Sequence, residues 1–238
     1  MTSPRPAFEG RPIEAVLIDA GGVLVDPNWE LVAGLLAARG APVPAAVLRA
    51  AEPAAKREID DATVIGSTTE DGRTSSYLAR VVRHAGIAMD RDALDGASQE
   101  MNSLHAQRGL WEVVPAGALG ALDALRSAGL RLALASNADR VLRGKLYELG
   151  IAARLDHLGI SGEMGVEKPD PRFFAGILAA INVPPDRALH VGDVYEIDVV
   201  GARAAGVGVV LVDIEDRSID RDVTRIRGLR ELPALLGI

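Results

Sequence analysis

The chain has 238 residues, of which 48% are hydrophobic, and a formal net charge of −7 at pH 7. This composition is typical of a globular protein and excludes a disordered chain. The acidic balance argues against nucleic acid as a partner, because nucleic-acid binders usually present a basic face. The absence of cysteine excludes disulfides, thiolate catalysis and zinc–thiolate sites.

Targeting signals are not evident either. The first eleven residues have no apolar segment of the kind found in signal peptides, and we expect them to form a loose tail. No apolar stretch approaches the roughly 20 residues that a membrane helix needs. We therefore expect a cytoplasmic protein with no membrane partner.

The first predicted element is a strand at Ala15–Ile18, whose uninterrupted apolar run suits a parallel strand buried on both faces. A turn is expected at Asp26–Asn28, because Pro27 disfavours helix at the residue before it. The alanine-rich segment 27–111 that follows has no strand pattern and predicts an all-helical insert. The expected breaks between its helices are near residues 40–44, 65–73 and 86–90.

The second half of the chain alternates strand and helix patterns. Strands are expected at 130–135, 157–161, 188–191 and 207–212, and helices at 115–128, 138–149, 171–181, 197–205 and 229–236. Short loops between alternating strands and helices imply right-handed βαβ units. The sequence therefore predicts an α/β fold with a parallel sheet and helices on both of its faces.

Polar residues follow several of the predicted strands. Asp19, Ser136 and Asp193 stand at strand ends, and Lys168 lies in a loop before a predicted helix. Each has an ordinary alternative: the aspartates could open turns, Ser136 and the next residue could cap a helix, and the lysine could be solvated. However, only three of the 26 basic residues are lysines, which hints at a need for a compact ammonium group at Lys168.

The parallel sheet brings these strand ends to one edge, where open α/β sheets bind their ligands. Two carboxylates from neighbouring strands can hold Mg²⁺, and the metal can neutralise and orient a phosphoryl group. A carboxylate can also act as a nucleophile and form an aspartyl-phosphate. The Ser136 hydroxyl, the amides that follow it and the Lys168 ammonium would bind the remaining phosphoryl oxygens.

Four segments, in this order along the chain, resemble the four motifs of the haloacid dehalogenase-like hydrolases. They are Asp19–Leu24, Ser136–Asn137, Lys168–Asp170 and Gly192–Asp198. The resemblance implies a Rossmann-like core and Mg²⁺ as cofactor. It assigns Asp19 and Lys168 as catalytic residues, and it assigns phosphate binding to Ser136, Asn137 and Lys168. The implied metal contacts are Asp19, the backbone carbonyl of Gly21, and Asp193, with Asp198 in support.

The insert between the first two motifs is similar to the helical C1 cap of this family. We therefore expect a core domain formed by residues 1–26 and 112–238, and a cap domain at residues 27–111. The implied partner is a small phosphorylated substrate, and the chain is expected to be a monomer or a homodimer.

Gly21 departs from the family pattern. Most phosphatases of the family carry a second aspartate at this position, which protonates the leaving group. A general acid contributes about 10²- to 10⁴-fold, so low activity is expected unless another group, such as Asp26, replaces it.

Three functions stay open. The first is a phosphatase. The second is a 2-haloacid dehalogenase, whose halide leaves without a proton, although the carboxylates of the fourth motif favour phosphate chemistry. The third is a protein that binds a phosphorylated ligand with little or no catalysis.

Overall fold

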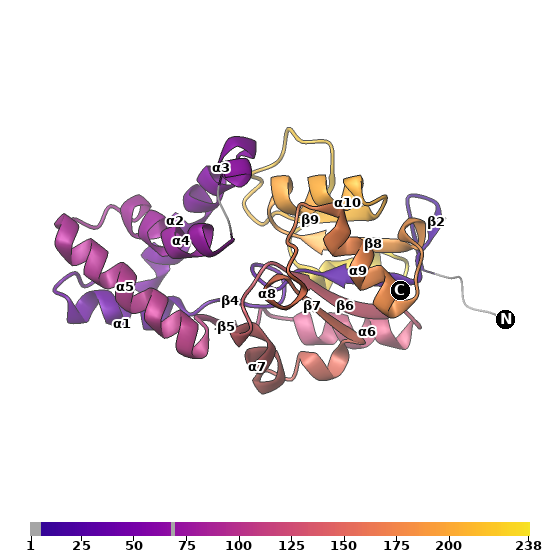
Figure 1. The fold of residues 1–238 in the computed structure, drawn as a ribbon, viewed down its shortest axis with the longest axis horizontal. Helices are drawn as coiled ribbons and strands as arrows, with labels where there is room; N and C mark the ends of the chain where they lie inside the picture. The colour runs from indigo at the N-terminus through magenta and orange to yellow at the C-terminus, as the bar shows by residue number, and fades with distance from the viewer. Residues whose placement is uncertain (1–5, 68–69) are drawn as a thin grey trace. The chain divides into compact units, whose positions relative to one another are not determined.

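The computed structural model describes residues 6–67 and 70–238. The chain divides into two compact units, one formed by the residues up to Asp26 together with Val113–Ile238, the other by Pro27–Glu112 (Figure 1). The assignment of these units as a core domain and a cap domain stays a prediction. No helix within the described ranges is both long and apolar enough to cross a membrane.

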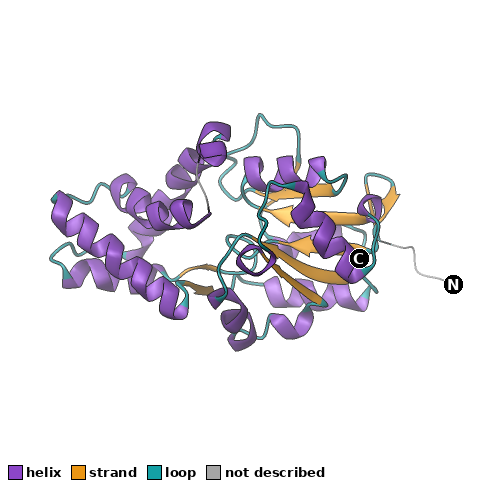
Figure 2. Ribbon diagram, viewed as in Figure 1, coloured by secondary structure: helices purple, strands orange, loops and turns teal. Residues whose placement is uncertain are grey.

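The larger unit is built on a parallel sheet, shown in Figure 2. Within the described residues this sheet has six strands in the order β10-β9-β8-β3-β6-β7, and every neighbouring pair is parallel. Their bounds are β3 (Ala15–Ile18), β6 (Arg131–Ser136), β7 (His157–Ile160), β8 (Ala188–Gly192), β9 (Gly208–Val212) and β10 (Thr224–Ile226). The predicted α/β fold with an inserted helical region is confirmed.

Helices cover both faces of this sheet, with α6 on one side and α9 and α10 on the other (Figures 1 and 2). The helices of this unit are α6 (Ala118–Ser127), α7 (Val141–Glu148), α8 (Ser161–Met164), α9 (Pro171–Ile181), α10 (Val200–Ala204) and α11 (Leu232–Leu235). Shorter turns are the 3₁₀ helices η1 (Ala152–Arg154), η2 (Pro185–Arg187) and η4 (Leu229–Glu231), and the π-helical turn η3 (Tyr195–Val199).

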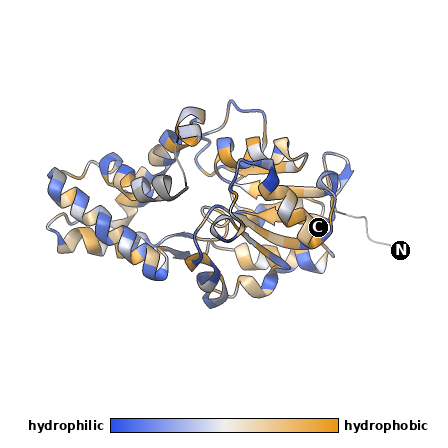
Figure 3. Cartoon of the chain, viewed as in Figure 1, coloured by the Kyte–Doolittle hydropathy of each residue, from blue (hydrophilic) through white to orange (hydrophobic). Residues whose placement is uncertain are grey.

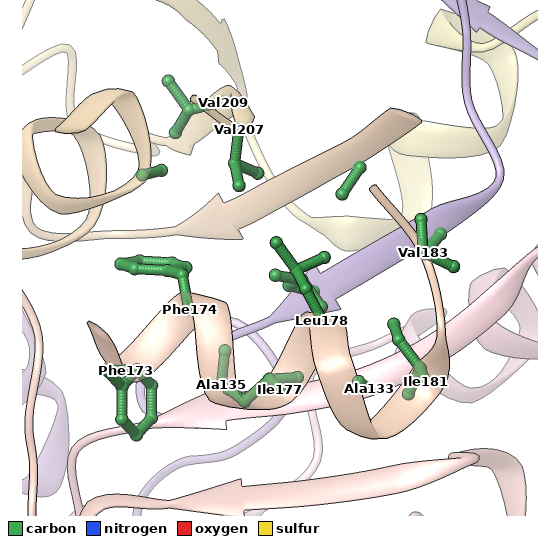
Figure 4. Packing of buried hydrophobic residues seen from close by; sticks show 14 of the residues in the cluster. Ala133, Ala135, Phe173, Phe174, Ile177, Leu178, Ile181, Val183, Val207 and Val209 are labelled. Atoms are coloured by element: carbon green, nitrogen blue, oxygen red, sulfur yellow. The ribbon is translucent and has the colours of Figure 1, made fainter. Parts of the chain in front are cut away.

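Much of the core lies between the sheet and α9 (Figure 4). The small side chains of Ala133 and Ala135 on β6 face this cluster, which includes the rings of Phe173 and Phe174. The two rings meet edge to face, with centroids 5.9 Å apart. Burying a phenylalanine side chain contributes roughly 1.5–3 kcal/mol. This packing fixes the start of α9 and with it the preceding loop. Figure 3 shows the same strands and helix as largely hydrophobic.

The second unit consists of helices, as its sequence predicts. They are α1 (Trp29–Ala38), α2 (Ala45–Ile59), α3 (Ala62–Ser67), α4 (Glu70–His84) and α5 (Arg91–Arg108). The expected breaks near 40–44 and 86–90 are present. The expected break at 65–73 includes residues 68 and 69, which lie outside the described residues. An additional break separates α2 from α3 at Asp60–Asp61.

The expected turn at Asp26–Asn28 is wrong. Asp26–Pro27 forms the short strand β4, which pairs with β5 (Trp111–Val113) where the chain passes between the two units. Asn28 instead begins α1, because its Oδ1 accepts a hydrogen bond from the Leu31 amide at 3.0 Å. A two-residue strand whose partner lies more than 80 residues away leaves no local pattern.

The N-terminal tail and the end of the sheet also differ from expectation. A two-stranded antiparallel hairpin, β1 (Ala7–Phe8) and β2 (Arg11–Pro12), lies where a loose tail is expected. Strand β10, which no sequence pattern predicts, pairs with β9 at the edge of the sheet.

Candidate active site

The carboxyl ends of three adjacent strands bring the predicted site residues together. Asp19 follows β3, Ser136 is the last residue of β6, and Asp193 follows β8. Strand β3 lies between β8 and β6 in the sheet, so these residues share one edge. Lys168 reaches the same place from the loop before α9.

Lys168 is buried rather than solvated, with a side chain only 1% exposed. Its Nζ lies 3.1 Å from Asp19 Oδ1 and 2.7 Å from Asp198 Oδ1. The ammonium group therefore joins the first predicted motif to the fourth. The alternative of a solvated loop lysine is excluded.

Asp198 accepts hydrogen bonds at both of its carboxylate oxygens. In addition to Lys168, Oδ1 lies 2.9 Å from His190 Nε2. Oδ2 accepts the backbone amides of Asp193 and Val194 at 3.0 and 2.9 Å. A Cβ at Gly192 would lie 2.1 Å from the Asp198 Cγ, so only glycine fits there. Asp198 thus holds the loop that carries Asp193.

His190 is completely buried in β8. Its Nδ1 lies 3.1 Å from the Leu17 carbonyl oxygen, which can only accept a hydrogen bond, so Nδ1 carries a proton. The ring meets Phe174 edge to face at 5.0 Å. Sequence reasoning did not predict the contact of His190 with Asp198.

Asn137 holds the Lys168 backbone through two hydrogen bonds. Its Nδ2 donates to the Lys168 carbonyl at 2.9 Å, and its Oδ1 accepts the Lys168 amide at 2.8 Å. Neither Ser136 nor Asn137 caps a helix, because α7 begins at Val141 with Arg140 as its N-cap residue. The expected contact of Asn137 with a phosphate stays a prediction, and its side chain already positions Lys168.

The charges at this edge shift the pKa values of its members. Burial raises the pKa of the Asp19 carboxyl; Lys168 opposes the rise, while Asp198 and Asp193 add to it. Burial alone would lower the pKa of the Lys168 ammonium, but Asp19 and Asp198 hold it above its ordinary value. For Asp198, burial is outweighed by Lys168 and His190, which hold the pKa of that carboxyl well below its usual range.

The donor set fits a hard divalent cation. Asp19, Asp193 and Asp198 each offer an oxygen, and these atoms lie within 4.8 Å of one another. Three carboxylates beside one ammonium group leave an excess of buried negative charge, and all-oxygen ligands are what Mg²⁺ prefers. Because Asp198 already accepts three hydrogen bonds and its Oδ1 also contacts His190 Nε2, Asp19 and Asp193 fit the role of direct ligands better.

Gly21 lies in the tight turn that follows Asp19. The Gly22 amide donates to the Val25 carbonyl at 2.9 Å, and Gly22 has a φ of 72°, which favours glycine. The predicted contact between the Gly21 carbonyl and a metal stays a prediction.

Sequence reasoning missed two residues at the same edge, Asp213 and Arg217. Asp213 is a buried carboxylate directly after β9, and Arg217 Nη2 donates to the Asp193 carbonyl at 3.1 Å. The signal that identified Asp19 and Asp193, a carboxylate at the end of an apolar strand, is also present at Asp213.

A lysine and three carboxylates thus lie at the carboxyl edge of a parallel α/β sheet, where proteins of this fold class bind their ligands. The family model for haloacid dehalogenase-like hydrolases matches residues 13–206. The chain therefore belongs to the haloacid dehalogenase-like hydrolases.

Among curated relatives, a phosphoserine phosphatase from Thermus thermophilus is 44% identical over 111 residues, which is 45% of each chain. A glyceraldehyde 3-phosphate phosphatase from Methanothermobacter thermautotrophicus is 36% identical over 106 residues, covering 44% of this chain and 47% of the relative. The chain thus matches about half the length of these relatives.

Solved structures share the fold across nearly the whole chain. The HAD-hydrolase YfnB from Bacillus subtilis, solved with magnesium bound, has a TM-score of 0.67 at 16% identity and covers 95% of this chain and 99% of its own. An L-2-haloacid dehalogenase from Xanthobacter autotrophicus has a TM-score of 0.61 at 20% identity, covering 94% and 98%. At such identities the likeness concerns the fold alone.

Proposed function

We propose that this chain is a Mg²⁺-dependent phosphatase that acts on a small phosphorylated molecule through an aspartyl-phosphate formed on Asp19. The observation that carries the proposal is the contact of the buried Lys168 ammonium with Asp19 and Asp198, together with the cluster that these two carboxylates form with Asp193. The phosphatase names of the two relatives support the same reaction class. Bound Mg²⁺ would supply neutralisation of the phosphate charge.

The chain's own residues would act as follows. An Asp19 oxygen attacks the phosphorus, the bond from phosphorus to the leaving oxygen breaks, and the leaving alkoxide takes up a proton from solvent water to give the alcohol. Water then attacks the aspartyl-phosphate, which releases inorganic phosphate and restores the carboxylate. The Lys168 ammonium and the Ser136 hydroxyl would bind the phosphoryl oxygens, while Asn137 and Asp198 hold Lys168 in place.

Gly21 supplies no acid for the leaving group. Turnover should therefore be slow for alkyl phosphates, whose alkoxide needs a proton, and faster for acyl or aryl phosphates, whose leaving groups need little protonation. Phosphoserine and glyceraldehyde 3-phosphate are small alkyl phosphates, and we propose substrates of this size. We further propose that residues 27–111 form the C1 cap that selects among them.

The test is a substrate panel run with and without Mg²⁺ on the wild-type chain and on Asp19→Asn. We expect phosphate release from acetyl phosphate and p-nitrophenyl phosphate to exceed release from phosphoserine, and we expect Asp19→Asn to lose at least about 10⁴-fold, because the nucleophile is removed. Equal rates for alkyl and aryl esters would mean that a general acid exists elsewhere. Surviving turnover in Asp19→Asn would exclude the covalent mechanism.

The same panel separates the other two functions. Chloride release from 2-chloropropionate without Mg²⁺ would identify a dehalogenase, for which the missing acid at Gly21 is no handicap because halide leaves without a proton. Binding of phosphorylated ligands with no turnover on any compound would identify a binding protein.

A further inference from the structure

The segment after β9 forms a turn organised by a single buried carboxylate. Asp213 Oδ1 accepts the Arg217 amide and its Oδ2 accepts the Ser218 amide, both at 2.8 Å. The side chain of Asp213 is 0% exposed. Because β9 lies beside β8, this turn stands at the same edge of the sheet as Asp193.

The turn directs the Arg217 side chain toward Asp193. The Arg217 side chain is only 8% exposed, with Nε 3.6 Å from Asp213 Oδ1 and Nη2 donating to the Asp193 carbonyl oxygen at 3.1 Å. A charged donor that is shielded from water makes a stronger hydrogen bond than a neutral or solvated one. Asp213 balances the charge of the Arg217 guanidinium and holds it in this position.

Both backbone polar groups of Asp193 are therefore held by the side chains of other residues. Asp198 accepts the amide on one side, and Arg217 donates to the carbonyl on the other. A residue whose backbone is fixed at both groups has little freedom to redirect its side chain.

A second arginine from the segment after β9, Arg221, contacts the residues that follow Asp193. Arg221 Nη1 lies 2.7 Å from Glu196 Oε1, and its guanidinium carbon lies 4.2 Å from the centroid of the Tyr195 ring. This contact holds the π-helical turn Tyr195–Val199, which includes Asp198. The segment after β9 thus supports the fourth motif along its length.

We propose that Arg217, held by Asp213, is a positioning residue that fixes the backbone of Asp193 and thereby the direction of its carboxylate. Its consequence for Mg²⁺ rests on the proposed function. Partners that orient a ligating residue commonly change metal affinity by about 10- to 100-fold when they are removed.

Arg225 offers a matched control. Its Nη1 lies 3.5 Å from Asp213 Oδ2 and 3.2 Å from Asp216 Oδ1. Arg217→Met and Arg225→Met each remove one arginine from Asp213, but the hydrogen bond to the Asp193 carbonyl is made by Arg217.

The first measurement is hydrogen exchange of the Asp193 and Val194 amides, followed by NMR in metal-free buffer. We expect exchange at these amides to be at least about tenfold faster in Arg217→Met than in Arg225→Met, the effect of losing one charge-assisted hydrogen bond. Exchange that is equal in the two variants would overturn the proposal. Arg217→Lys and Arg225→Lys give the same comparison with the charge retained, should Arg217→Met not fold.

The second measurement is the Mg²⁺ dissociation constant, obtained by titrating MgCl₂ into the same samples. We expect it to rise about tenfold in Arg217→Met, with an intermediate value for Arg217→Lys and no change for Arg225→Met. An unchanged constant in Arg217→Met would overturn the link from Arg217 to the metal site. A wild-type chain that binds no Mg²⁺ would instead contradict the proposed function, and the exchange comparison would still decide the role of Arg217.

Discussion

Lys168 is the residue on which the chemistry and the stability of the site both depend. Its Nζ contacts Asp19 and Asp198, and its backbone is held by Asn137. A buried charge that loses its partner is costly, because water cannot replace the lost interaction. The ammonium also favours the ionised form of Asp19 that a nucleophile requires, because it opposes the rise of the Asp19 pKa on burial.

We expect Lys168→Met to lower the free energy of unfolding by about 3 kcal/mol, because it leaves buried carboxylates without their cation. Phosphatase kcat should fall at least about 10²-fold, since a positive group at the phosphate is lost. Urea unfolding and steady-state kinetics measure the two effects.

The control for this change is Lys145→Met. Lys145 is also a largely buried lysine, but its ion-pair partner Glu148 has a side chain that is 68% exposed. This variant should lose about 1 kcal/mol or less and keep its activity. Equal stability losses in the two lysine variants would contradict the role given to Lys168.

At the level of elements, the sequence predicts those whose signals are local. Helix α9 runs from Pro171 to Ile181 as expected, because Asp170 caps its start and Asn182 takes a positive φ of 53° at its end. The predicted strands agree with the structure to within one or two residues, because unbroken apolar runs mark buried parallel strands.

Other elements depend on partners far away in the sequence. Strand β4 exists only through its pairing with β5, and β10 only through its pairing with β9. The contacts of Asp198 and Arg217 likewise join residues that are distant in the sequence. Asp198 contacts Lys168, which lies in the loop before α9. Arg217, which follows β9, contacts the Asp193 carbonyl after β8. Strand ends predict which side chains share an edge, but they do not predict which of them hydrogen-bond.

The helical unit contains a polar network around Glu52 of α2. Tyr77 Oη donates to its Oε1 at 2.6 Å, Trp29 Nε1 donates to its Oε2 at 3.3 Å, and Lys56 Nζ lies 3.0 Å from Oε1. Burial raises the pKa of Glu52, but Lys56 and the hydrogen bonds from Tyr77 and Trp29 outweigh it, so the pKa is below its ordinary value. The network joins α1, α2 and α4.

The lowered pKa of Glu52 sets the sign of a pH dependence. The unfolded chain binds this proton more readily, so the stabilisation is complete above the ordinary value of 4.5 and is lost as the pH falls through the folded-state pKa. Wild type should therefore exceed Glu52→Gln in stability by about 2 kcal/mol at pH 7, and the difference should shrink below pH 4.5. Tryptophan fluorescence measures it, because Trp29 and Trp111 both lie in this unit.

Glu58→Gln is the matched control on the same helix. Glu58 contacts Arg80, Arg83 and His84 at the surface, where salt screens such pairs. The effect of Glu58→Gln on stability should disappear at roughly 0.5 M salt, because salt screens exposed charge pairs. The effect of Glu52→Gln should persist, because buried pairs are screened much less. A Glu52 effect that is insensitive to pH or is removed by salt would contradict the buried network.

On the scale of the whole molecule, the fold concentrates negative charge at the edge of the sheet where we propose that Mg²⁺ binds. The chain already carries a net charge of −7, and the carboxyl edge of the sheet adds buried repulsion, because Asp198 and Asp193 both raise the pKa of Asp19. Sites arranged for function often reduce stability in this way. Removing the Asp193 carboxylate, which leaves the contacts of Lys168 with Asp19 and Asp198 in place, should therefore stabilise the metal-free protein while removing its response to the metal.

We expect Asp193→Asn to raise the Tm of the metal-free chain by about 2–4 °C, the shift that 1 kcal/mol produces in a chain of this size. Mg²⁺ should raise the Tm of wild type, because a ligand that binds only the folded state stabilises it, and it should leave Asp193→Asn unchanged. Asp186→Asn, which changes the net charge equally at an exposed position, should keep the wild-type response. Scanning calorimetry with and without MgCl₂ measures all three. A lower Tm for metal-free Asp193→Asn would contradict the repulsion at this edge, and a retained Mg²⁺ response would exclude Asp193 as a ligand.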